Sequence, residues 1–279
     1  MSYFRLVTVV LNKQKLEAVL LIEGKNTDLP FNLHIFETVT STNKTAWEFL
    51  AQQPGSECVV IAAQQTNGRG QWGRQWLSQA GGLYLSFGFA PQMDINLGYQ
   101  LTLATAWGIA EQLRKYGVDV EIKWPNDLVL DGRKLGGILT ETKVRASKIT
   151  QAVIGVGINW KNPVPSTGIN LHSWNSQYNS VKIPCLEKLA ARVLLGIHSG
   201  IQCLSAEGVN ILLSRYIKLL SNMGEEVYVN DEFSGTVVGV TEAGNLHLRR
   251  SSGGNITETP ASIYLEPGTI SLGYRKSSV

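Results

Sequence analysis

A predicted β-hairpin is the feature that most restricts the fold of this chain. Apolar runs at Leu128–Leu130 and Leu135–Leu139 flank the pair Asp131-Gly132. Asp-Gly favours the two-residue turn of a hairpin, because both turn positions take a positive φ. The second strand contains Gly136-Gly137, and two glycines there leave a surface on which a ligand can approach the backbone closely.

The sequence around this hairpin alternates between strand and helix patterns. Short apolar or alternating runs predict strands at Leu33–Phe36, Cys58–Ala63, Leu83–Phe87, Val120–Trp124 and Val153–Ile158. Apolar residues at helical spacing predict helices at Thr42–Gln52, Tyr99–Tyr116, Leu186–Leu204 and Val209–Leu220. The intervening segment Asn162–Pro184 is rich in Pro, Ser and Asn and is expected to be a loop.

Both ends of the chain differ from this middle region. Residues 1–30 carry two short strand-like pieces, Leu6–Leu11 and Ala18–Ile22, and are too short for a winged helix–turn–helix. After Gly224, short strands are predicted at Val227–Val229, Thr236–Val240, Leu246–Leu248 and Ile263–Leu265. The predicted organisation is an N-terminal extension (1–30), a main domain (31–222) and a small β-barrel domain (223–279).

Composition excludes several functional classes. Among 279 residues, 25 basic and 22 acidic side chains give a net charge of +3, which is too small to indicate nucleic acid or a membrane as the main partner. Three scattered cysteines, Cys58, Cys185 and Cys203, argue against a disulfide framework or zinc site. The first residues do not resemble a secretory signal, and no apolar stretch is expected to span a bilayer, so a cytoplasmic protein is expected.

A glycine-rich loop is the first candidate for binding chemistry. Gly68–Gly73 satisfies the dinucleotide-binding pattern G-x-G-x-x-G, but that motif needs a helix to follow, and a strand pattern follows here. A plain surface loop is the other alternative. Arg69, Arg74, Trp72 and Trp76 instead combine cationic forks with flat apolar faces, which suits a small anionic ligand with a planar part.

Lys134 is the second candidate. Taken alone it would be a solvated hairpin lysine, but the glycines after it indicate that its ammonium lies beside a ligand and stabilises negative charge there. Asn126 and Asp127 could be simple turn residues. The run Gly155–Asn159 repeats the theme of glycines inside an apolar strand that ends on a polar residue.

Together these motifs resemble the biotin–protein ligase family. They occur in the family's order, as Ser41-Thr42-Asn43, Gln65, Gly68-Arg69-Gly70 with Gly73-Arg74 and Trp76, Gly82–Ser86, Lys123–Asp127, Arg133–Gly137 and Gly155–Asn159. Each motif alone is weak evidence for the family, but their joint occurrence is specific for it. One departure is Gln71, because the family loop commonly has a second arginine at that position.

The resemblance implies an α+β fold of class II synthetase type, with a mixed β-sheet flanked by helices, followed by a small SH3-like barrel. It implies that biotin attacks the α-phosphate of Mg·ATP to give biotinyl-AMP and pyrophosphate. A lysine of a biotin carboxyl carrier protein, from acetyl-CoA carboxylase or a related enzyme, then takes the biotin and releases AMP. Neither the metal ligands nor the oligomeric state follow from it.

The resemblance also implies roles for individual side chains. Biotin is expected to contact Ser41, Thr42, Asn43, Gln65, Arg69, Gly70, Gln71, Lys134 and Gly137. ATP is expected to contact Arg74, Trp76, Lys123, Asn126, Lys134 and Asn159. Catalysis is assigned to Lys134 and Arg69, and Asp127 is expected to orient the acceptor lysine.

Two other functions stay open at this point. A lipoate or octanoate ligase shares the fold and the adenylate chemistry, but its usual arginine run and His-Asp pair are not found in this sequence. A non-catalytic biotin-sensing module is the alternative from another class. The presence of Lys134, Arg69 and Arg74 argues against it.

Overall fold

A computed structural model describes residues 11–24, 31–178, 182–229, 232–250, 261–270 and 272–274, and its centre is an eight-stranded β-sheet. The strand order is β1 (Phe31–Val39), β2 (Glu57–Gln65), β3 (Leu83–Phe89), β8 (Lys148–Ile158), β7 (Arg133–Arg145), β6 (Asp127–Leu130) and β5 (Glu121–Lys123), with β4 (Met93–Asp94) on β8. Strands β1 and β2 pair in parallel, and the other neighbours are antiparallel. The predicted mixed sheet is confirmed.

The predicted hairpin joins β6 to β7. Asp131 and Gly132 have φ values of 49° and 71°, as a tight turn with two left-handed positions requires. Strand β7 runs on to Arg145, beyond the predicted end at Leu139, and so carries Glu141 along the same sheet.

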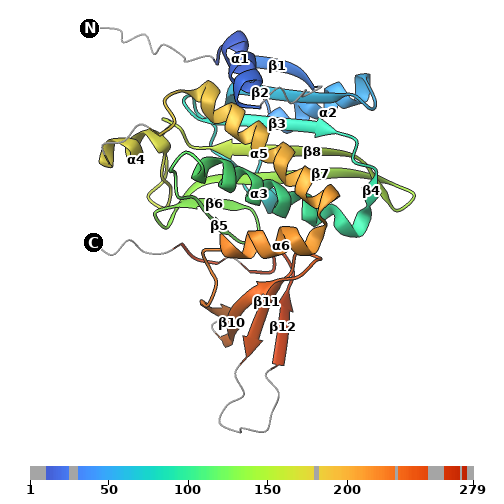
Figure 1. Ribbon diagram of the computed structural model, residues 1–279, viewed down its shortest axis with the longest axis vertical. Coiled ribbons are helices and arrows are strands. Elements are labelled where there is room, and N and C mark those ends of the chain that lie inside the picture. Colours follow the sequence, from blue (N-terminus) through green and yellow to red (C-terminus); the bar gives the residue numbers. More distant parts are fainter. Residues whose placement is uncertain are drawn as a thin grey trace.

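Helices cover both faces of the sheet (Figure 1). Helix α2 (Thr42–Gln52) packs on β2, β3 and β8, while α3 (Gly98–Arg114) and α5 (Leu186–Ala206) lie across the opposite face. Side chains of β8 alternate accordingly: Val153 belongs to the cluster under α2, and Ile154 belongs to the core under α3 and α5. Helix α6 (Val209–Lys218) packs on α3 and α5.

The C-terminal residues form a second, antiparallel sheet of four described strands. Its order is β12 (Ala261–Leu265), β11 (Leu246–Arg250), β10 (Glu232–Val240) and β9 (Glu226–Val229), which confirms the short strands expected there. Figure 1 places it below the main sheet, next to α6. The Trp124 indole donates a hydrogen bond of 2.9 Å to the Gly244 carbonyl and ties the two sheets together. Closure into an SH3-like barrel and the domain boundaries stay predictions.

Two local predictions were wrong. Ala18–Ile22 lies in helix α1 (Lys13–Glu23), not in a strand; Asn12 caps this helix, and Leu16 and Leu20 pack beside α5. The segment Asn162–Pro184 is not only a loop, because Asn170 caps the short helix α4 (Leu171–Gln177). The predicted strand Leu6–Leu11 falls almost wholly outside the described residues.

Helix α5 also corrects the expectation about membrane-spanning length. By length and composition its 21 residues could cross a membrane, and 61% of its most apolar window is buried inside the protein. A core helix of a folded domain meets the same criterion, and α5 packs against α1, α3 and α6.

Glycines set the close contact between α3 and α5. A Cβ at Gly108 would lie 2.0 Å from the Gly196 carbonyl oxygen, and one at Gly200 would lie 2.1 Å from the Ala104 carbonyl oxygen. Backbone atoms cannot move aside as a flexible side chain can, so the two helices touch at this distance only while these positions lack side chains.

We expect Gly108→Ala to destabilise the protein, although alanine is the better helix former. The added methyl group overpacks the α3–α5 contact, and a loss of about 2 kcal/mol in the free energy of unfolding is expected from urea denaturation. Gly273→Ala is the control, since no atom lies within 4 Å of a Cβ there. Equal stability of the two variants would contradict this packing.

Candidate active site

A cavity opens on the α2 face of the sheet, with about 1030 Å³ of empty space including its open mouth. Its walls come from α2, the glycine-rich loop, β6–β8 and the C-terminal residues Gly268, Ile270 and Leu272. The residues predicted to bind ligand that line it are Ser41, Thr42, Asn43, Gln65, Arg69, Gly70, Gln71, Arg74, Trp76, Lys123, Asn126, Asp127, Lys134 and Gly137. Lys134 and Arg69 therefore share one hollow.

The floor of the cavity is backbone. Gly137 pairs with Gly157 across β7 and β8, two residues from Gly155. A Cβ at Gly157 would lie 2.5 Å from the Trp76 indole, and one at Gly155 would lie 2.2 Å from Asn43 Oδ1. The Trp76 indole nitrogen is buried against Gly157 and has no hydrogen-bond partner among the described residues.

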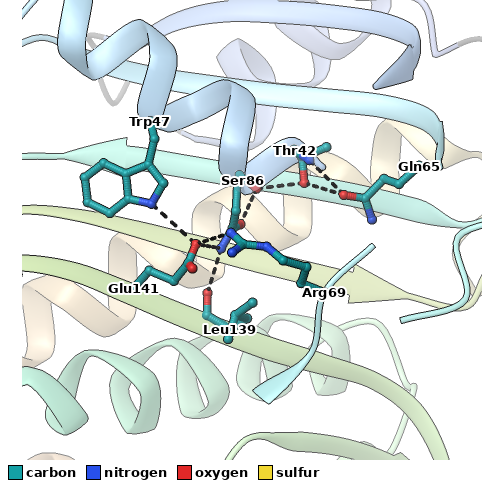
Figure 2. Close-up of polar contacts among 8 residues, drawn as sticks. Thr42, Trp47, Gln65, Arg69, Ser86, Leu139 and Glu141 are labelled. Atoms are coloured by element: carbon teal, nitrogen blue, oxygen red, sulfur yellow. Dashed lines mark hydrogen bonds and ion pairs between the residues drawn. The ribbon is translucent and has the colours of Figure 1, made fainter. Parts of the chain in front are cut away.

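One end of the cavity holds neutral polar groups (Figure 2). The Thr42 amide and hydroxyl donate to Gln65 Oε1 at 2.8 and 3.1 Å, and the buried Ser86 hydroxyl bonds to Thr42 Oγ1 at 2.8 Å. Ser86 also bonds to Asn43 Oδ1 at 2.6 Å, which fixes the orientation of that amide. These donors and acceptors suit a neutral polar ligand group.

The other end is cationic. Lys134 Nζ lies 2.7 Å from Asp127 Oδ1, and the Tyr274 hydroxyl donates to Asp127 Oδ2. The Tyr274 ring lies under Lys123 Nζ at 3.5 Å. The pKa of Lys123 is lowered to about 8. Burial is the main cause, Lys134 and Arg74 act on this pKa in the same direction, and Asp127 opposes the shift. The crowding of three cations around one carboxylate favours an anionic ligand.

The glycine-rich loop is folded back on itself. Arg69 pairs with Gln75, and the Gly70 amide donates to the Arg74 carbonyl at 2.7 Å. The Gln71 side chain bonds to Tyr99 of α3, and the exposed Trp72 lies against the backbone of Gly268. A single 3-10 turn, Gln71–Gly73, and then strand β3 follow the glycines, which rules out the dinucleotide-binding geometry.

One predicted residue does not reach the cavity. The buried Asn159 donates to the Lys134 carbonyl at 3.3 Å and accepts from Asn162 at 3.0 Å, so it supports the backbone behind Lys134. Asn126 lines the cavity and also donates to the Ile138 carbonyl at 2.7 Å.

Sequence reasoning missed three residues around the cavity. Ser86 stands only at the end of the Gly82–Ser86 motif, Tyr274 lies in the C-terminal segment far from every motif, and Glu141 lies beyond the predicted end of β7. For Glu141 a signal existed: with two-residue periodicity it shares a strand face with Leu139 and Gly137.

The fold is an α+β domain, and its cavity has a neutral polar end and a cationic end. A model of the biotin/lipoate A/B protein ligase family matches residues 35–159. The Escherichia coli protein named bifunctional ligase/repressor BirA is 32% identical over 222 residues, which cover 77% of this chain and 68% of that protein. The chain belongs to the biotin/lipoate A/B protein ligase family.

Other relatives are matched over less of their length. BirA of Bacillus subtilis is 36% identical over 125 residues, so the chain spans only 38% of it. The human biotin–protein ligase is 27% identical over 242 residues, or 33% of its length. Among solved structures, a biotin protein ligase from Aquifex aeolicus in complex with biotin and ATP superposes with a TM-score of 0.67 and 26% identity, over 88% of this chain and 99% of that one.

The lowered pKa of Lys123 gives a direct test of the cationic end. We expect its ammonium to titrate near pH 8 in NMR spectra of isotope-labelled protein, so that it is charged below this pH and neutral above it. Asp127→Asn removes the carboxylate that opposes the shift and should lower this pKa further. Asp119→Asn, at an exposed carboxylate away from the cavity, is the control. Titration near 10.4, as for a free lysine, would contradict this arrangement.

Proposed function

We propose that the chain is a biotin–protein ligase, which uses ATP to convert biotin to biotinyl-AMP and transfers biotin to a lysine of a carrier protein. The observation that carries this proposal is the cavity itself. Neutral hydrogen-bonding groups stand at one end and cations at the other, and between them Trp76 and Asn43 pack on the glycines of β7 and β8. The Aquifex aeolicus ligase, described with biotin and ATP, supports it.

The chemistry requires activation because a carboxylate is a poor acyl donor. In the first step a biotin carboxylate oxygen attacks the α-phosphorus of ATP and pyrophosphate leaves. Two anions have to meet, so a positive charge between them lowers the barrier. Lys134 is placed for this task, since its ammonium stands at the glycine floor beside Asp127 and 5.3 Å from the Trp76 ring.

The polar end of the cavity would receive the ureido group of biotin. Thr42, Gln65 and Asn43 offer fixed donors and acceptors, because Ser86 and Ser78 hold their side chains in place. The ring and chain of biotin would lie beside the Trp76 indole and Asn43, which themselves pack directly on Gly157 and Gly155. Arg69, Gly70 and Gln71 would cover them from the loop, and Arg74 with Lys123 would meet the phosphates.

In the second step the amine of the acceptor lysine attacks the activated carbonyl carbon, loses a proton, and AMP leaves. Asp127 is the carboxylate in the cavity nearest to Lys134, and we propose that it orients this amine. Its two oxygens contact Lys134 and Tyr274 in the ligand-free protein, so the incoming amine would exchange with one of these partners.

ATP would enter together with its magnesium ion. Mg²⁺ that enters with a nucleotide is usually held by the phosphate oxygens together with one or two protein carboxylates and water, and the phosphate oxygens would supply ligands here. The acceptor would be a biotin carboxyl carrier protein of acetyl-CoA carboxylase or a related enzyme. The ligase itself would be located in the cytoplasm, where cysteines stay reduced, and its three cysteines are free.

Biotin-dependent exchange of pyrophosphate into ATP tests the first step. Exchange is expected with biotin and not with lipoate, and transfer of biotin to a carrier lysine should follow. Exchange that depends on lipoate and not on biotin would favour a lipoate or octanoate ligase. Biotin binding without any exchange would favour a sensing module.

Lys134→Gln should lower the exchange rate at least about 100-fold, because it removes the charge between the two anions. Lys143→Gln is a matched control: Lys143 stands on the same strand, over the Trp47 ring at 4.5 Å, and outside the cavity. Both variants should keep the melting temperature of the parent protein. Comparable loss in both variants would contradict the role of Lys134.

A further inference from the structure

Glu141 on β7 sits behind the cavity and holds two of its walls. Its Oε2 accepts from Asn43 Nδ2 at 2.8 Å, from the Trp47 indole at 3.3 Å and from Arg69 Nη2 at 2.9 Å. Figure 2 shows Trp47 approaching this carboxylate from α2 and Arg69 approaching it from the glycine-rich loop. Glu141 lines the groove on the outer side of Arg69, and it does not line the ligand cavity.

The three donors connect two different elements to Glu141. Asn43 and Trp47 are on α2, one helical turn apart, and Arg69 is on the loop. Asn43 also accepts from Ser86, so its amide nitrogen has to point towards Glu141 and its oxygen towards Ser86. The remaining contact of that nitrogen, to the Leu139 carbonyl, is 3.4 Å long.

The ion pair between Arg69 and Glu141 is partly exposed to solvent. The Arg69 side chain is 43% exposed and that of Glu141 is 27% exposed, so solvent screens their attraction and the pair adds little to folding stability. Its effect is on geometry: it fixes the guanidinium at the cavity edge, on a loop whose glycines permit many other conformations.

We propose that Glu141 is a positioning residue that orients Arg69 and Asn43 together at the biotin end of the cavity. It acts through these two side chains and has no contact of its own with the ligand. The proposal rests on the proposed biotin ligase function. Since Glu141 is away from the phosphate end, its loss should weaken biotin binding and retention of biotinyl-AMP, with little effect on ATP.

The kinetic test compares Glu141→Ala and Glu141→Gln with the parent in pyrophosphate exchange. Glu141→Ala should raise KM for biotin at least about tenfold, while KM for ATP stays within about twofold. Glu141→Gln keeps an acceptor for Asn43 and Trp47 but loses the charge facing Arg69, so an intermediate KM is expected. Release of free biotinyl-AMP should rise in the same order. If Glu141→Ala does not fold, the glutamine variant carries the comparison.

Glu207→Gln is the matched control, because Glu207 pairs with Arg215 at 2.7 Å on a similarly exposed surface. It should leave both KM values unchanged. Unchanged KM for biotin in both Glu141 variants would overturn the proposal. So would a parallel rise in KM for biotin and ATP, which indicates general damage to the cavity.

A second readout needs no ligand or activity. Hydrogen–deuterium exchange of loop residues 68–76 should be faster in both Glu141 variants than in the parent and in Glu207→Gln. Equal exchange would show that Glu141 does not hold the loop. A parent without biotin-dependent exchange of pyrophosphate would refute the ligase function instead, and the loop measurement would still decide the role of Glu141.

Discussion

The site depends on the absence of side chains on one face of two paired strands. Gly137, Gly155 and Gly157 leave the β7–β8 backbone bare, and Asn43 and Trp76 close on it to distances that a Cβ at Gly155 or Gly157 would not allow. The polar end, the cationic end and the loop are all arranged around this floor. On the opposite face the same strands carry Ile138, Ile154 and Val156 into the core. Because side chains alternate along a strand, one face of β7 and β8 forms the cavity and the other packs in the core.

The two ends of the cavity differ in charge. Neutral amides and hydroxyls stand near the start of α2, while Lys123, Lys134 and Arg74 gather around Asp127 at the other end. Burial makes this gathering costly, as the lowered pKa of Lys123 indicates, and an anionic ligand would relieve the cost. The C-terminal residues take part, because Tyr274 contacts both Asp127 and Lys123.

Local patterns predicted much of this arrangement. The Asp131-Gly132 hairpin, helix α2 and the strands of the main sheet follow from turn chemistry and periodicity, which act over a few residues. The motif residues also came together, because β6–β8, α2 and the loop meet at one face. Asn159 did not join them, since strand ends can turn a polar side chain towards backbone carbonyls as easily as towards a ligand.

What could not be predicted depended on distant contacts or weak local signals. Helix α1 has little amphipathic pattern and depends on its Asn12 cap and on packing beside α5. Glu141 and Tyr274 gain their roles from partners about 70 and 150 residues away in sequence, a relation that no local pattern encodes.

The most direct measurement of the central claim is calorimetric titration of biotin into the parent and into Gly157→Ala. Binding at one site per chain, weakened at least about tenfold by the added methyl group under Trp76, is predicted. Equal affinity in the two proteins would contradict a binding site whose shape depends on Trp76 packing on Gly157.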